Sequence, residues 1–180
     1  MFKSLVTSTD EIKILLESPM RIGSWDSNKL DNINDNYAIC STFKEKGINI
    51  GKYKEYDIFQ YEKGNEIADI FTMDDFVSAY FNYEVRNNVM IEKRVWQDDL
   101  HIGLCRNIIF DYYLKKFNGM ISDGLHSPLG EKYWKKLLKQ AKDDGYEIFS
   151  INISDNNAIK LEFYGGTTSS ENYRFLIKSK

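Results

Sequence analysis

Apolar and polar positions alternate regularly in the middle of the chain. Val89, Ile91, Lys93 and Val95 alternate with Met90, Glu92, Arg94 and Trp96. Alternation with a period of two, in branched and aromatic residues, is typical of a strand. The sequence therefore predicts a strand over residues 89–96.

After this run the apolar spacing becomes helical. The apolar positions are Leu104, Cys105, Ile108, Ile109 and Tyr112. Their spacing predicts a helix from about His101 to Lys116. The apolar stretch 119–122 that follows suits a buried strand, parallel to the first one after a helical crossover.

A second helix has strong start and stop signals. Ser127 can cap its first turn, and Pro128 fits the first helical position. Asp144 and Gly145 end it. Its buried stripe is predicted to be Tyr133, Trp134, Leu137, Leu138 and Ala141, with Trp134 in the core.

The first half of the chain reads as a short helix followed by strands. We expect a helix at 9–17, a polar loop at 21–36, a strand at 37–43, a polar connection at 44–52, and strands at 53–61, 66–72 and 76–85. Turn residues at 63–65, 74–75 and 86–88 predict antiparallel hairpins, because Asn, Asp and Gly tolerate positive φ.

The last third predicts strands at 146–153 and 173–177. The segment 158–164 favours a strand slightly over a helix. Many strands before one crossover and two helices after the central strand predict an α/β fold with a mixed, mostly antiparallel sheet flanked by helices.

Three sequence strings carry a resemblance to a known family. They are VMIEKRVW at 89–96, DDLHIGLC at 98–105 and ISDGLHSPLGEKYW at 121–134. Together they resemble the core of the GCN5-related N-acetyltransferase (GNAT) family, particularly its small members from bacteriophages. The resemblance covers residues 53–154 and implies one domain over 1–180, with an N-terminal part at 1–52 and closing strands at 155–180. It also implies splayed central strands.

The same resemblance implies a function and a site. A GNAT-like protein transfers an acetyl group from acetyl-CoA to an amine. By position, Glu92 is the candidate base and Tyr133 the candidate acid. The residues implied to hold the cofactor are Val95, Leu100, His101, Ile102, Gly103, Leu104 and Cys105.

The phosphate loop departs from the family pattern. Leu100 and Cys105 stand where the family usually has Arg or Gln and a second glycine, so only Gly103 is kept. Asp98 and Asp99 lie just upstream, and like charges repel a pyrophosphate. An alternative is therefore a non-catalytic protein of this fold that binds and modulates a host protein.

Composition limits the remaining possibilities. The 180 residues carry a net charge of −3, with a pI near 5.5 and a mean hydropathy of −0.48. We expect no nucleic-acid partner, no membrane span and a cytoplasmic location. Cys40 and Cys105 read as reduced cysteines. Two histidines without ligand spacing predict no metal site.

Two local features have competing explanations. Ser122, Asp123 and His126 suggest a catalytic triad, but their close spacing rarely supplies the geometry, so loop and capping roles are favoured. Gly103 in the first turn of a helix is expected where a cofactor or a neighbouring strand approaches the backbone closely.

Overall fold

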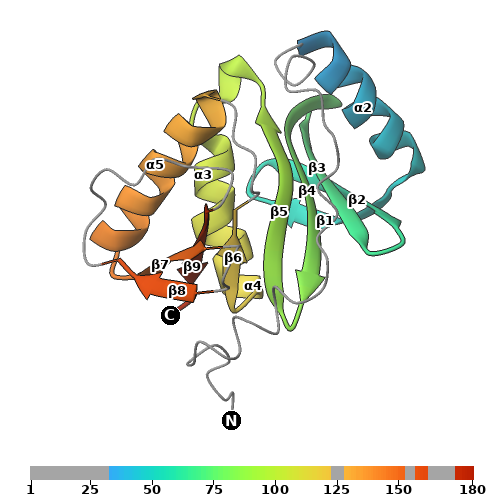
Figure 1. Cartoon of the computed structure of the whole chain (residues 1–180). Helices are drawn as coiled ribbons and strands as arrows, with labels where there is room; N and C mark the ends of the chain where they lie inside the picture. The colour runs from blue at the N-terminus through green and yellow to red at the C-terminus, as the bar shows by residue number, and fades with distance from the viewer. Residues whose placement is uncertain (1–32, 123–127, 153–156, 162–172) are drawn as a thin grey trace. The chain divides into compact units, whose positions relative to one another are not determined.

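A computed structural model describes residues 33–122, 128–152, 157–161 and 173–180 of the chain (Figure 1). Its contacts divide the chain into two compact units. Among the described residues, the hairpin unit consists of 33–85 and 92–112, and the C-terminal unit consists of 86–91, 113–122, 128–152, 157–161 and 173–180.

The fold is mixed α/β with a nine-stranded sheet. The hydrogen-bonded strand order is β1-β2-β3-β4-β5-β6-β9-β7-β8. Pairing is antiparallel in β1–β2, β2–β3, β3–β4, β6–β9, β7–β9 and β7–β8, and parallel in β5–β6. The predicted fold class is thus confirmed at this level.

In the hairpin unit, successive strands are joined by tight turns. The strands are β1 (Ile48–Tyr53), β2 (Tyr56–Lys63), β3 (Glu66–Met73) and β4 (Phe76–Arg86, whose last residue belongs to the C-terminal unit). Asp74 and Asp75 both have positive φ, as does Gly64. These conformations suit two-residue hairpin turns, so the predicted turn chemistry is confirmed.

The predicted strand at 37–43 is wrong, because this segment lies in helix α2 (Ile33–Lys46). Cys40 and Phe43, three residues apart, both pack against the sheet, which is a helical spacing. A short apolar run such as this one does not distinguish a helix from a strand clearly. The predicted polar connection at 44–52 is also wrong beyond Gly47, because Ile48 begins the outermost strand β1.

Both faces of the sheet in the hairpin unit are covered. On one face α2 lies along β2 and β3 (Figure 1), and Cys40 packs into a cluster with Ala68, Ile70, Val77 and Tyr80. On the other face Phe71 makes edge-to-face contacts with Phe81 at 5.8 Å and Tyr112 at 6.2 Å between ring centroids. The segment that ends at Tyr112 therefore covers the second face.

The chain between the central strands is an irregular helix. Strand β5 spans Val89–Gln97, as predicted. It is followed by a 3-10 turn η2 (Asp99–His101), α3 (Leu104–Ile108), a π-helical turn η3 (Ile109–Tyr113) and α4 (Leu114–Lys116). The predicted helix is therefore present, but it begins at Leu104 and widens at its centre.

The C-terminal unit contains the crossover strand and the second long helix. Strand β6 (Gly119–Ile121) pairs in parallel with Val89–Ile91, as predicted. The other elements are α5 (Pro128–Asp143), β7 (Glu147–Asn152), β8 (Asn157–Lys160) and β9 (Tyr173–Lys178). Residues 157–160 thus form a strand, the favoured of the two alternatives.

The core of this unit forms between α5 and the strands. Trp134 is 1% exposed and its ring lies 6.4 Å from that of Phe175, so its predicted core position is confirmed. A Cβ at Gly119 would lie 2.8 Å from the carbonyl oxygen of Ile177, so close strand approach requires glycine there. The predicted helix at 9–17, residues 21–32 of the predicted loop and the Ser127 cap lie outside the described residues. The rest of that predicted loop, 33–36, is wrong, because these residues form the start of α2.

Candidate functional site

The loop predicted to hold a cofactor is folded around Asp98. The Asp98 carboxylate accepts a 2.8 Å hydrogen bond from the amide of Leu100. The backbone carbonyl oxygen of Asp98 accepts a 3.0 Å hydrogen bond from the amide of His101. The Asp98 amide itself donates to the carbonyl oxygen of Ser78 at 3.0 Å. Asp98 therefore caps the 3-10 turn, a role that Asp favours.

The other end of the loop is also bonded internally. The amide of Cys105 donates a 3.0 Å hydrogen bond to Oε1 of Gln97, the last residue of β5. The Cys105 thiol donates to the carbonyl oxygen of Trp96 at 3.3 Å. Leu104 and Cys105 are buried. These contacts fix the start of α3 against the end of the strand.

Gly103 owes its identity to backbone conformation. It precedes α3 with φ of +86° in the left-handed region. An added Cβ would meet only the flexible Arg106 guanidinium, at 3.6 Å. The expected close approach of a strand is therefore absent at this glycine, and positive φ is a sufficient reason for it.

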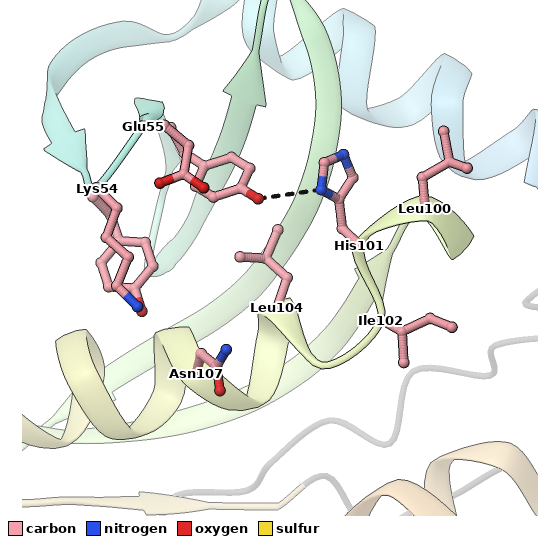
Figure 2. Close-up of a pocket in the computed structure, with 9 residues that line it drawn as sticks. Lys54, Glu55, Leu100, His101, Ile102, Leu104 and Asn107 are labelled. Carbon is pink, nitrogen blue, oxygen red and sulfur yellow. Dashed lines mark hydrogen bonds between the residues drawn. The ribbon is translucent and has the colours of Figure 1, made fainter.

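A pocket of about 270 Å³ lies beside this loop. One wall is the turn between β1 and β2, and the other is the loop with the first turns of α3 (Figure 2). The pocket is lined by Tyr53, Lys54, Glu55, Tyr56, Leu100, His101, Ile102, Leu104 and Asn107. One pocket is thus lined by a turn that the sequence did not point to and by four of the predicted cofactor residues: Leu100, His101, Ile102 and Leu104.

Two hydrogen-bonded groups set the walls of the pocket. The Tyr56 hydroxyl lies 3.1 Å from Nδ1 of His101, and the two rings meet edge to face (Figure 2). At the other end, Oδ2 of Asp111 accepts hydrogen bonds from the Tyr53 hydroxyl at 3.0 Å and from Nζ of Lys54 at 3.3 Å. Lys54 is therefore a cation with a carboxylate partner.

The local environment keeps these groups protonated. Burial is the main cause that raises the pKa of both Tyr53 and Tyr56, and the Glu55 carboxylate adds to the effect at Tyr56. Hydrogen bonds to Tyr53 and Asp111 raise the pKa of Lys54. At neutral pH these residues are two neutral phenols and an ammonium group, which can bind a ligand but cannot act as bases.

The predicted catalytic residues lie in different units. Glu92 in β5 belongs to the hairpin unit and is only 6% exposed, so it does not lie in a solvent-exposed row of charged side chains. Its charge helps to raise the pKa of the Cys105 thiol, after burial. Tyr133 is half-buried on α5 of the C-terminal unit, edge-on to Trp134. Val95, the remaining cofactor residue, is half-buried in β5.

Ser122 has a structural role. It is fully buried, its amide donates to the carbonyl oxygen of Phe175, and its hydroxyl accepts from the Phe175 amide, both at 2.9 Å. Asp123 and His126 lie outside the described residues. Among the residues that the structure describes, no group of three His, Cys, Asp or Glu side chains is placed to hold a metal ion, and no helix is long and apolar enough to span a membrane.

The loop does not fit a pyrophosphate in this conformation. The amides of Leu100, His101 and Cys105 already bind protein oxygens. The Asp98 carboxylate lies within the loop and repels a phosphate. Arg106, next to Gly103, is a cation that sequence reasoning missed, because the family pattern places its basic residue before the glycine.

No family model, curated protein or solved structure matches this chain.

Proposed function

We propose that this protein acts by binding a partner protein through the loop at residues 98–103, on a GNAT-like scaffold. The observation that carries the proposal is the loop itself. The amides of Asp98, Leu100 and His101 bind protein oxygens, while the side chains of Leu100 and Ile102 are 90% and 89% exposed. A partner that covers these aliphatic side chains would remove their apolar surface from water, which favours binding.

The hydrogen bonds around the pocket support its role as a preformed binding surface. Its phenols and ammonium group are protonated at neutral pH, and Lys54 is paired with Asp111. The Tyr56–His101 hydrogen bond ties one wall to the other. Such a site holds its shape without a ligand, as a preformed docking surface does.

Acetyl transfer from acetyl-CoA to an amine is a second candidate function. It is favoured by the strand order and by the parallel pairing of β5 with β6 across a helical crossover, both of which agree with a GNAT-like fold. In that case Glu92 and Tyr133 are the residues proposed as base and acid. Fold alone supports this candidate, and many functions can share one fold.

Calorimetric titration with acetyl-CoA separates the two candidates. We expect no saturable heat up to millimolar ligand, because the loop offers bonded amides and a carboxylate. Binding with a Kd well below 1 mM, together with release of the CoA thiol when an amine is added, would establish acyl transfer and overturn the proposal.

A charge variant tests whether the loop carboxylates are the reason that acetyl-CoA is not expected to bind. Replacing Asp98 and Asp99 with Asn removes two like charges from the loop, and Asn at position 98 can still cap the turn. Acetyl-CoA affinity that rises in this variant and falls again with salt would show that a phosphate site is present and blocked by charge. Unchanged absence of binding at low and moderate salt supports the protein-binding function.

A further inference from the structure

We infer that the loop tip binds a partner segment that combines aliphatic and basic side chains. The loop tip is defined as Leu100 and Ile102 with the adjacent acidic residues Asp98 and Asp99, and Glu55 lies on the turn that faces it across the pocket. The inference deepens the proposed function, on which it rests, by naming the surface and the kind of partner.

The aliphatic part of the tip consists of two side chains that are two residues apart in the sequence. Leu100 and Ile102 are the most exposed large apolar side chains among the described residues. Both point away from the Tyr56–His101 hydrogen bond (Figure 2), toward solvent. Covering large apolar side chains with a partner lowers the free energy of the complex, because their surface is removed from water.

The tip is held in one conformation by hydrogen bonds. Asp98 binds the amides of Leu100 and His101 and is itself bonded to Ser78 on β4. Gly103 turns the chain into α3 through its positive φ. Ordering a flexible loop costs affinity, so a tip that is already ordered keeps more of the free energy of binding.

The charge around the tip favours a basic partner. Glu55, Asp98 and Asp99 give three negative charges, and Lys54 is neutralised by its 3.3 Å pair with Asp111. The Arg106 guanidinium, 3.6 Å from the Cβ position of Gly103, adds one positive charge near the tip against these three. The local net charge is therefore negative, which disfavours nucleic acid and other polyanions and favours Lys or Arg in the partner.

The pocket offers a place for one partner side chain. Its volume of about 270 Å³ lies between the Tyr53–Tyr56 turn and the tip, with Leu104 among the residues that line it and the Glu55 carboxylate on the turn. A long basic side chain has an aliphatic stem and a charged head. Its stem can pack against Leu104 while its head stays near Glu55.

The experiment uses a displayed library of random peptides, selected on the full chain. The enriched peptides are synthesised and their affinity is measured by fluorescence anisotropy. We expect Lys or Arg next to Leu, Ile or Phe in these peptides, and a loss of affinity of about tenfold or more in the Leu100→Ser/Ile102→Ser variant. The matched control, Ile48→Ser/Phe76→Ser, changes two other exposed apolar residues, 70% and 75% exposed, and should bind within about twofold of the parent.

Kinetics test the charge component. Asp99→Asn should slow association several-fold at low salt and lose this effect at high salt, with a smaller change in dissociation, because peripheral charges act on encounter. All four aliphatic and aromatic positions are exposed, so circular dichroism should show the variants folded.

Three outcomes overturn the inference. In the first, no peptide is enriched on the parent protein relative to the Leu100→Ser/Ile102→Ser variant. In the second, the enriched peptides lack basic residues. In the third, the Ile48→Ser/Phe76→Ser control loses as much peptide affinity as the Leu100→Ser/Ile102→Ser variant. Enriched peptides that lack basic residues but still depend on Leu100 and Ile102 would refute only the inferred partner chemistry, whereas peptides that bind elsewhere on the chain would also refute the proposed binding through the loop. Saturable acetyl-CoA binding with turnover would instead remove the proposed function.

Discussion

The hydroxyl of Tyr83 donates a 2.8 Å hydrogen bond to Oδ2 of Asp69, and both side chains are fully buried in the hairpin unit. Nε2 of Gln60 donates to the other carboxylate oxygen, also at 2.8 Å. A buried carboxylate is costly unless its oxygens accept hydrogen bonds. This pairing across β2, β3 and β4 therefore fixes the register of three strands with polar contacts.

Removing the Tyr83 hydroxyl should destabilise the protein. Tyr83→Phe leaves Oδ2 of Asp69 without this donor, and we expect a loss of about 1.5 to 3 kcal/mol in the free energy of unfolding. Urea unfolding followed by circular dichroism measures it. Tyr61→Phe is the matched control, because Tyr61 is half-buried and stacks on Phe43 through its ring. An equal effect of both variants would contradict the role of the Asp69 contact.

Stability should fall at alkaline pH, in part through Tyr80. Burial is the main cause that raises the pKa of Tyr80 to about 12, against about 10 in an unfolded chain. Below pH 10 both states keep the proton, so its contribution is constant. Between about pH 10 and 12 the unfolded chain loses the proton first, and the folded state loses up to about 2 kcal/mol. Urea unfolding from pH 8 to 11 should show a flatter decline for Tyr80→Phe.

Neither cysteine should react in the folded protein. Cys40 is 0% exposed and Cys105 1% exposed. Burial raises the pKa of Cys40 to about 12 and that of Cys105 well above its usual value, so the reactive thiolate is scarce. Ellman's reagent should modify no thiol at pH 8 and two thiols in urea. Rapid modification in the native state would show that α2 or the start of α3 opens readily.

Substitution of Gly103 tests whether backbone conformation alone requires glycine. Gly103→Ala should cost about 1 kcal/mol of stability, because a Cβ is strained at a φ of +86°. Gly103→Asn should cost less, since Asn tolerates the left-handed region. Thermal unfolding compares them. An equal loss for Ala and Asn would point to steric crowding, which the 3.6 Å distance to Arg106 argues against.

Trp134 should be a main support of the C-terminal unit. Trp134→Ala leaves a cavity beside Phe175, and we expect a loss of about 3 to 5 kcal/mol. Chemical unfolding measures it, with the exposed Lys136→Ala on the same helix as a control. A variant that unfolds like the parent would show that other side chains fill the space.

Local chemistry made many elements predictable from the sequence. The hairpins follow from residues that accept positive φ, such as Asp74, Asp75, Asn87 and Asn88. Helix α5 follows from Pro128 and from an apolar stripe with helical spacing. These residues determine local backbone conformation within a few positions of each other, so the turns and the helix can be predicted without knowledge of the rest of the chain.

Only tertiary structure decided α2 and the nature of the candidate site. Cys40 and Phe43 form a helix face because Ala68 and Ile70, far along the chain, offer an apolar surface to cover. The loop amides are occupied because Asp98 and Gln97 turn toward them, and the pocket exists because the Tyr53–Tyr56 turn lies opposite. Spacing along a sequence predicts periodicity and turns, whereas these contacts depend on which distant groups meet in space.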